Sequence, residues 1–154
     1  LIPSLLYVED AAQAKVVAGQ LVRDRGLDLA SDPRFFRNFK RGIGSQIQGF
    51  LPDLDNQSIR FENVGQWFLA EVIQQLKASN PEVAQSVVFT VPVDSFETYR
   101  LWLGQVSEAL DLEQVRMLDE PTAAALGYGL SDRETLLVID FGGGTLDLSL
   151  VRLD

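Results

Sequence analysis

The 154-residue sequence contains no cysteine and no histidine. These two absences exclude Ser-His-Asp and Cys-His catalysis, disulfide bonds, dithiol redox chemistry and conventional zinc sites. A metal ion bound by this chain must therefore be a hard ion held by oxygen ligands. No apolar run approaches the roughly 18 residues that a membrane-spanning helix requires, which argues against a membrane protein.

Basic residues are also scarce, with 13 Lys and Arg against 22 Asp and Glu and a net charge of −9. This balance argues against nucleic acid and anionic membranes as partners, because both select basic surfaces. An acidic protein can still bind phosphate through backbone N–H groups and a divalent cation. The negative charge lies entirely in the second half, since residues 1–77 hold 9 basic and 9 acidic residues whereas residues 78–154 hold 4 and 13.

The length suits one domain, and the apolar fraction of 46% is typical of a chain with a buried core. The first residue is not Met, and residues 1–4 lack the basic flank of a signal peptide. From the sequence we expect a soluble, cytoplasmic chain that is an excised piece of a longer protein. The charge shift and the loop-forming pair Asn80-Pro81 predict a structural boundary near residue 81.

The first half holds one clear helix. Residues 65–79 place apolar side chains at helical spacing, whereas residues 4–8 are typical of a short strand and residues 11–23 fit either a helix or a second strand. Residues 34–41 carry four basic side chains around three phenylalanines, which predicts a solvated basic face over an aromatic anchor. Gly42 and Gly44 are expected to end that segment.

The second half alternates strands and helices, which indicates an α/β layered fold. The continuously apolar residues 86–91 predict a strand that is buried on both faces and ended by Pro92. A helix is expected over residues 95–110 and a strand over residues 114–118. Glu120-Pro121 is a typical helix start, the residues after it are small, and Gly129 is a plausible helix end.

The most informative segment is residues 140–145, Asp-Phe-Gly-Gly-Gly-Thr, between an expected buried strand over residues 135–139 and a second strand over residues 146–151. Two interpretations are open. A plain hairpin turn needs one or two glycines. Three glycines also let backbone N–H groups converge on an anion, while Asp140 could hold Mg²⁺ through water and Thr145 could offer its hydroxyl to the same phosphate.

Four stretches, in the correct order, resemble the Hsp70 family of chaperone ATPases, which belongs to the actin and hexokinase superfamily. Residues 138–147 resemble its second phosphate motif, and residues 118–130 (Leu-Asp-Glu-Pro-Thr-Ala-Ala-Ala-Leu-Gly-Tyr-Gly-Leu) its signature helix start. Residues 39–44 are similar to its Lys-Arg-aliphatic-Ile-Gly segment. Residues 90–92 with Arg100 match a shorter pattern. The likeness covers most of the chain from Phe39 onward.

The resemblance implies roles for individual residues around ATP or ADP and Mg²⁺. It implies that Lys40 orients the attacking water and stabilises charge on the γ-phosphate, and that Glu120 and Asp140 surround the metal and that water. The other implied roles are phosphate binding by Gly142, Gly143, Gly144 and Thr145, and an interdomain relay through Pro92 and Arg100. Asp147 would support either that loop or, with Asp140, the metal shell.

The sequence also departs from the family pattern. Leu146 replaces an aromatic residue, Asp119 replaces Asn, and residues 93–97 replace the usual segment of the relay. The family's first phosphate hairpin would lie before Leu1, and its adenosine loop and peptide-binding domain after Asp154. The resemblance thus implies an incomplete actin-like (ribonuclease H-like) ATPase lobe, a mixed sheet with flanking helices. Its parts would be a peripheral subdomain over 1–81, a core subdomain lacking its first hairpin over 82–134, and a phosphate hairpin that opens the second lobe over 135–154.

The function implied by the resemblance is that of a stress-response chaperone whose parent protein binds Mg-ATP and hydrolyses it to drive a conformational cycle on unfolded polypeptide. A J-domain co-chaperone and a nucleotide exchange factor would be further partners. The segment alone is expected to bind ATP weakly and to be inactive, and its unpaired sheet edge suggests dimers. An alternative is a nucleotide-sensing scaffold or regulatory relative of the same fold. The Glu-Pro-Thr-Ala-Ala-Ala helix start disfavours an actin-like polymer subunit or a sugar kinase.

Overall fold

The computed structural model describes residues 1–45, 47–79, 86–93, 97–129, 134–141 and 146–152. Over these residues the chain forms helices and four small sheets, one of them parallel and three antiparallel, so the predicted α/β class is confirmed. The expected boundary pair at residues 80 and 81 lies outside the described residues. No helix in the described ranges combines the length and hydrophobicity that a membrane span needs.

The N-terminal unit is built on an antiparallel sheet of order β2-β1-β3, formed by β1 (Leu5–Asp10), β2 (Lys15–Ala18) and β3 (Phe35–Arg37). The segment that the sequence left open, residues 11–23, contains β2 and most of the short helix α1 (Gln20–Asp24). Side chains alternate along a strand, so one face of β1 places Leu6 and Val8 in the core with no exposed surface.

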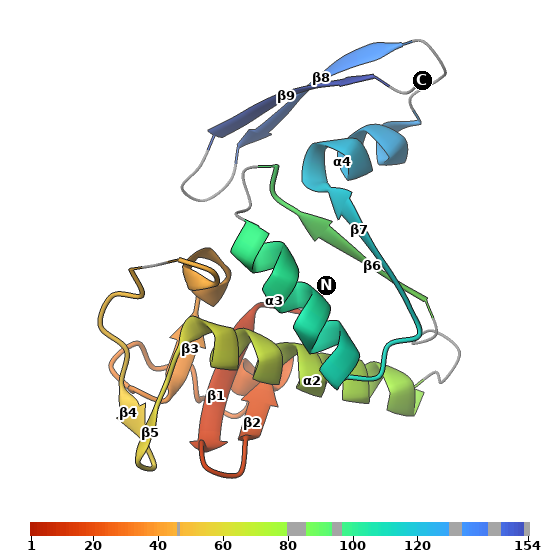
Figure 1. Ribbon diagram of the computed structural model, residues 1–154. Helices are drawn as coiled ribbons and strands as arrows, with labels where there is room; N and C mark the ends of the chain where they lie inside the picture. Colours follow the sequence, from red (N-terminus) through yellow and green to blue (C-terminus); the bar gives the residue numbers. More distant parts are fainter. Residues whose placement is uncertain (46, 80–85, 94–96, 130–133, 142–145, 153–154) are drawn as a thin grey trace.

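The helix α2 (Phe61–Ser79) crosses this sheet, as Figure 1 shows, and begins four residues earlier than the hydrophobic pattern predicts. Its early start has a local cause, because Gln48 Oε1 accepts a hydrogen bond from the Phe61 backbone N–H at 3.0 Å. That bond satisfies one of the N–H groups that a helix leaves unpaired at its first turn. Between β3 and α2 lie the 3₁₀-helix η1 (Phe39–Gly42) and the small hairpin of β4 (Asp53–Leu54) and β5 (Gln57–Ser58).

The next unit is a parallel strand pair with helices, β6 (Ser86–Val91), α3 (Glu97–Ala109), β7 (Gln114–Asp119) and α4 (Glu120–Tyr128). Gly129 ends α4 at φ 87°, a left-handed conformation that glycine adopts without strain, and Pro92 follows the last residue of β6; both predictions are confirmed. The prediction that β6 is buried on both faces is wrong. Val88 is 56% exposed, because this sheet has only two strands over the described residues.

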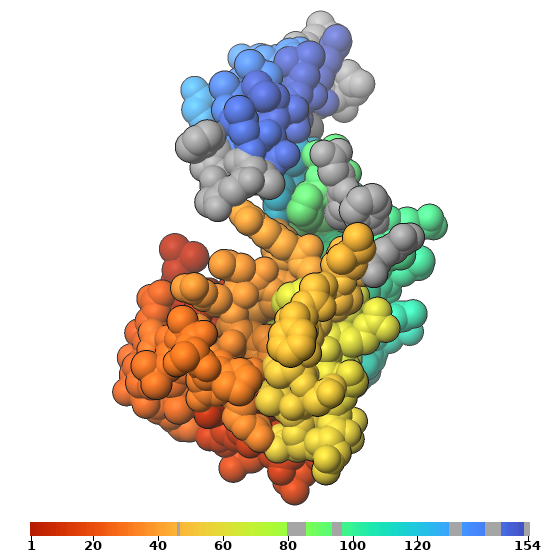
Figure 2. Space-filling model, turned by 90° about the vertical axis from the view of Figure 1, so that its left-hand side faces the viewer, coloured from red at the N-terminus to blue at the C-terminus, as the bar shows by residue number. Residues whose placement is uncertain are grey.

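The last unit is the antiparallel hairpin of β8 (Thr135–Phe141) and β9 (Leu146–Arg152), whose inner face packs on α4. The expectation of a buried β8 is wrong. Leu137 and Ile139 are 58% and 59% exposed, because in a two-stranded sheet alternate side chains turn away from the single helix that covers it. Figure 2 shows this hairpin as a blue protrusion that stands apart from the N-terminal unit, which is coloured red to yellow.

Candidate functional site

A cavity of about 310 Å³ lies where β6 and β7 end and the β8–β9 hairpin approaches them. Parallel strands bring their carboxyl ends to the same edge of a sheet, and here Val91 pairs with Asp119 at that edge. The residues that follow these two strand ends, Pro92 and Glu120, therefore enter the cavity together. The lining is completed by Val93, Pro121, Val138, Asp140, Leu146, Asp147, Leu148 and Ser149.

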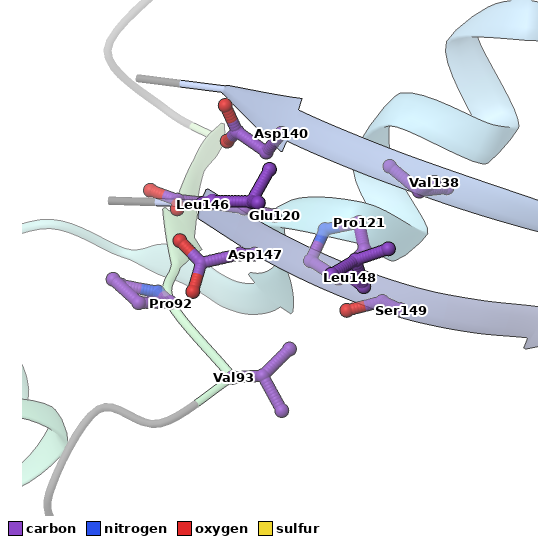
Figure 3. Close-up of a pocket in the computed structure, with 10 residues that line it drawn as sticks. All are labelled: Pro92, Val93, Glu120, Pro121, Val138, Asp140, Leu146, Asp147, Leu148 and Ser149. Carbon is purple, nitrogen blue, oxygen red and sulfur yellow. The ribbon is translucent and has the colours of Figure 1, made fainter. Parts of the chain in front are cut away.

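Two carboxylates face each other across the hairpin part of this cavity. Asp140 and Asp147 are directly paired in the register of β8 and β9, and only the pair of Phe141 and Leu146 lies between them and the loop. Figure 3 shows their side chains at the same end of the cavity as the carboxylate of Glu120. Carboxylate oxygens are the donors that Mg²⁺ prefers, and Mg²⁺ commonly keeps several waters. Among the described residues no three His, Cys, Asp or Glu side chains form a metal-binding cluster, so a directly bound ion would have at most two carboxylate ligands here.

Lys40 reaches this region from the N-terminal unit. Its Nζ donates to Glu120 Oε1 at 2.5 Å, which joins residues 80 positions apart in the sequence. The two side chains are 50% and 31% exposed, so solvent reaches both groups. Three of the residues predicted from the sequence, Glu120, Asp140 and Asp147, thus line one cavity, and Lys40 is bonded to the first of them.

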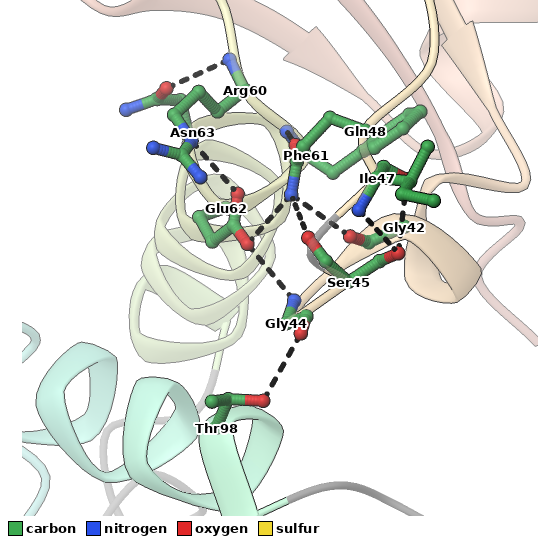
Figure 4. A network of polar contacts seen from close by, with 10 residues as sticks. All are labelled: Gly42, Gly44, Ser45, Ile47, Gln48, Arg60, Phe61, Glu62, Asn63 and Thr98. Atoms are coloured by element: carbon green, nitrogen blue, oxygen red, sulfur yellow. Dashed lines mark hydrogen bonds and ion pairs between the residues drawn. The ribbon is translucent and has the colours of Figure 1, made fainter.

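The position of Lys40 depends on buried neighbours and on a hydrogen-bond network. The preceding residue, Phe39, is 4% exposed and packs its ring 5.4 Å from that of Phe68 on α2. In the network drawn in Figure 4, Glu62 Oε1 accepts from the Gly44 backbone N–H at 2.9 Å, and Thr98 on α3 donates to the Gly44 carbonyl at 3.1 Å. The segment that carries Lys40 is therefore attached to both long helices.

A third hydrogen-bonding residue, Gln48, extends the same network. Its Nε2 donates to the Gly42 carbonyl at 3.1 Å and to Glu62 Oε1 at 3.0 Å. Gln48 was not predicted from the sequence, because nothing in an isolated Gln distinguishes a surface side chain from one that links two backbone segments.

The two residues assigned to the relay lie in different places. Pro92 lines the cavity, whereas Arg100 on α3 donates through Nη2 to Asp119 Oδ1 at 2.5 Å. Asp119 stands at the N-cap position of α4 and makes no side-chain capping bond there. From the sequence, Asp119 was noted only as a departure from the family pattern. The opposite charges of Arg100 and Asp119 are the one sequence signal that could have suggested that these two side chains form an ion pair.

Burial raises the pKa of the Tyr99 phenol on α3, and the nearby Glu120 carboxylate raises that pKa further, whereas Lys40 acts in the opposite direction. The ring of Tyr99 lies 5.7 Å from that of Trp102 on the same helix. Tyr99 is therefore a neutral group beside the Lys40–Glu120 pair at physiological pH.

Some predicted residues fall outside the described residues. They are Gly142, Gly143, Gly144 and Thr145 of the glycine-rich loop, and residues 94–96 of the altered relay segment. The strands on either side of the glycine-rich loop are β8 and β9, which pair up to Phe141 and Leu146. The hairpin itself is thus confirmed, and the role of the loop in phosphate binding stays a prediction.

The chain is similar to known proteins over most of its length. The family described as Hsp70 protein matches residues 52–154. Over 116 residues the chain is 33% identical to a chaperone protein DnaK of Deinococcus deserti and to one of Deinococcus proteolyticus; each alignment covers 74% of the chain and 18% of the relative. Over 91 residues it is 41% identical to the chaperone protein dnaK1 of a Synechocystis species, covering 54% of the chain and 13% of the relative. The alignments therefore span less than a fifth of these curated relatives.

Proposed function

The chain belongs to the Hsp70 family, and from that premise we propose that the cavity between the β7–α4 junction and the β8–β9 hairpin binds the phosphates of Mg-ATP or Mg-ADP. Family membership makes the chain part of a chaperone ATPase domain with the actin-like fold and relates it to nucleotide-binding heat shock proteins. The observation that carries the proposal is the convergence of Glu120, Asp140 and Asp147 on one cavity of about 310 Å³, with Lys40 bonded to Glu120.

The donor set of the cavity fits a hard divalent cation. Asp140 and Asp147 would supply oxygen ligands, and two carboxylates would leave room for the waters and phosphate oxygens of a magnesium shell. When bound, Mg²⁺ would neutralise phosphate charge. The glycine-rich loop over 142–145 would offer backbone N–H groups to the phosphates, and Thr145 its hydroxyl.

In this proposal Lys40 and Glu120 both act near the terminal phosphate of the nucleotide. The Lys40 ammonium orients the attacking water and stabilises negative charge there, and the Glu120 carboxylate lies beside the metal and that water. Their mutual bond holds both groups at the edge of the cavity before a nucleotide arrives. Since Lys40 comes from the N-terminal unit and Glu120 from α4, nucleotide binding would act on two parts of the chain at once.

The wider function rests on the same premise. We propose that the parent protein hydrolyses ATP to drive a conformational cycle on unfolded polypeptide, in the cytoplasm, with a J-domain co-chaperone and a nucleotide exchange factor as partners. Pro92 and Arg100 would carry the nucleotide state to the substrate-binding domain. The division into 1–81, 82–134 and 135–154 is part of this proposal. It is supported by the separate sheets of the three segments.

The test is Mg-dependent ATP turnover of the full-length protein that carries this segment. Lys40→Ala and Asp140→Asn should each lower turnover by about 100-fold or more, the size of effect that follows loss of one charge-stabilising group. Glu108→Gln removes an exposed carboxylate of α3 that does not line the cavity and should leave turnover unchanged. Full turnover in both site variants would overturn the assignment of the site.

A second candidate function is a nucleotide-sensing scaffold that binds Mg-ATP without turning it over. The departures over residues 93–97, next to the cavity-lining Pro92, favour this alternative. Binding of Mg-ATP by the full-length protein, with no turnover above that of Asp140→Asn, would identify the scaffold. The isolated 154-residue chain should bind Mg-ATP weakly in either case, and tight stoichiometric binding in a titration would contradict this.

A further inference from the structure

The first turn of α3 is in direct contact with the segment that carries Lys40, here called the Lys40 segment (residues 39–44). The Thr98 hydroxyl donates to the Gly44 carbonyl at 3.1 Å, as Figure 4 shows. The two backbones also approach closely, because a Cβ at Gly44 would lie 2.9 Å from Thr98 Oγ1 and 3.1 Å from the Tyr99 backbone nitrogen. Gly44 has φ 78°, a conformation that glycine adopts without strain. Glycine at this position therefore permits the contact between the Lys40 segment and α3.

The same turn of α3 also contacts the segment that carries Glu120. Two residues after Thr98, the Arg100 guanidinium donates to Asp119 Oδ1 at 2.5 Å. Asp119 is the last residue of β7 and directly precedes Glu120 in the chain. Residues within one helical turn keep a constant spacing, because backbone hydrogen bonds fix them. The first turn of α3 therefore links the two segments that supply the oppositely charged groups at the edge of the cavity.

The Thr98 bond differs from the Lys40–Glu120 bond in its dependence on the nucleotide. In the proposed function the Lys40 ammonium turns from the Glu120 carboxylate to a phosphate, so that bond cannot hold the Lys40 segment while nucleotide is bound. The Thr98 bond involves neither charged group and can persist. A further bond between the two units, from Lys77 to the Leu110 carbonyl at 3.4 Å, lies at the other ends of α2 and α3. Near the cavity, Thr98 thus supplies a bond to the Lys40 segment that does not depend on the nucleotide state.

We propose that Thr98 is a positioning residue of the phosphate site, which acts on Lys40 through the Gly44 carbonyl. Its hydroxyl keeps the Lys40 segment at the distance from Glu120 at which both groups reach the terminal phosphate. Thr98 does not line the cavity, so it touches neither the nucleotide nor the metal, and its effect passes through the backbone of residues 40–44. The inference rests on the proposed function, in which Lys40 and Glu120 act on one phosphate.

Cross-linking with a carbodiimide measures the position of Lys40 without any nucleotide. This reagent joins an amine to a carboxylate that is in contact with it, so the full-length protein that carries this segment should yield a Lys40–Glu120 amide. The ion pair of Lys15 and Glu9, 3.1 Å apart within the N-terminal unit, gives the internal reference. Thr98→Val keeps the branched shape and removes the donor, and it should lower the ratio of the two cross-links by about threefold or more. Thr98→Ser keeps the hydroxyl and should preserve the ratio. An unchanged ratio in Thr98→Val would overturn the proposal.

Mg-ATP turnover by the same full-length protein measures the consequence for the site. Thr98→Val should lower kcat by about fivefold, the effect of losing one neutral hydrogen bond, and should leave KM unchanged because Thr98 does not touch the nucleotide. Thr98→Ser should retain the wild-type kcat. The matched control is Thr135→Val, the same change at an exposed threonine of β8 outside the cavity lining, which should alter neither constant. In a Lys40→Ala background Thr98→Val should have no further effect, because Thr98 acts through Lys40.

These outcomes separate the inference from the proposed function on which it rests. Unchanged turnover in Lys40→Ala would overturn the proposed function itself. Turnover that is lost in Lys40→Ala but complete in Thr98→Val would overturn the role of Thr98 alone. A loss in Thr98→Val that is equally large with and without Lys40 would show that Thr98 acts on the fold rather than on Lys40, and it would overturn the inference as well.

Discussion

Two helical glycines, Gly65 in α2 and Gly104 in α3, should respond in opposite ways to replacement by alanine. Alanine is the better helix former by roughly 0.5–1 kcal/mol, so an unobstructed Gly→Ala change inside a helix stabilises the protein. A Cβ at Gly104 would meet nothing within 4 Å. We therefore expect Gly104→Ala to raise the free energy of unfolding by about 0.5–1 kcal/mol.

At Gly65 the new methyl group has no room. It would lie 2.6 Å from Ile43 Cδ1 and 2.8 and 2.9 Å from two ring atoms of Trp102. Ile43 is only 7% exposed and Trp102 is a rigid ring, so one of them must move within a packed region. Such overpacking costs about 1–3 kcal/mol, and the helix preference of alanine offsets about 1 kcal/mol of it. We expect a net loss of up to about 2 kcal/mol.

The assay is urea denaturation of the two variants and the wild type, followed by circular dichroism. The midpoint should shift down for Gly65→Ala and up for Gly104→Ala while the slope of the transition stays the same, because a packing change leaves the surface exposed on unfolding unaltered. Trp102 fluorescence should change in the native state of Gly65→Ala alone. Equal stabilisation by both substitutions would refute the inferred close approach of Trp102 to α2.

Three further predictions concern other parts of the chain. Leu6→Ala, which empties a wholly buried position of β1, should lower the free energy of unfolding by about 2–5 kcal/mol in the same assay. Arg34 and the Ala11 N–H hold the pKa of Asp55 at about 2, below its ordinary 3.8, so folding favours the ionised carboxylate. This contribution to stability is present above pH 3.8 and is lost as the pH falls toward 2. The melting temperature of Arg34→Gln should therefore fall less than that of the wild type over this pH window. A double-mutant cycle on Lys40 and Glu120 should give a coupling in stability of about 1 kcal/mol or less at neutral pH, because solvent reaches both groups; a coupling of several kcal/mol would contradict their exposure.

The local pattern of the sequence predicted the positions of helices correctly, but it did not predict which strands are buried. The hydrophobic spacing of residues 65–79 and the Glu120-Pro121 helix start both correspond to observed helices, since the hydrogen bonds and first turn of a helix join residues close in sequence. Exposure depends on how many layers pack together. The apolar runs of β6 and β8 are typical of strands covered on both faces, yet Val88 and Leu137 are exposed because two-stranded sheets leave one face open over the described residues.

The candidate site was predicted in part from its residue types and in part from the family resemblance. Asp140 and Asp147 flank a glycine-rich turn, so a hairpin places them opposite each other, and the structure does pair them. Lys40 and Glu120 lie 80 residues apart, and no spacing rule joins such residues. Their proximity depends on η1 being held between α2 and α3 by Glu62 and Thr98. Arg100 and Asp119 were likewise predicted separately, and only the fold brings them together.

The position in the sequence of the residues that form the main hydrophobic core indicates which part of the chain folds first. All its fully buried members lie between Leu6 and Val64, and Tyr99 and Trp102 of α3 pack against them only partly buried. A unit whose core closes within its own 60 or so residues can fold while the rest of the chain is still being synthesised. The contact between Lys40 and Glu120 must wait until α3, β7 and α4 have docked on that surface. Amide hydrogen exchange should therefore be slowest in β1, and the Lys40–Glu120 contact should be among the first lost in a partial unfolding that leaves the N-terminal core intact.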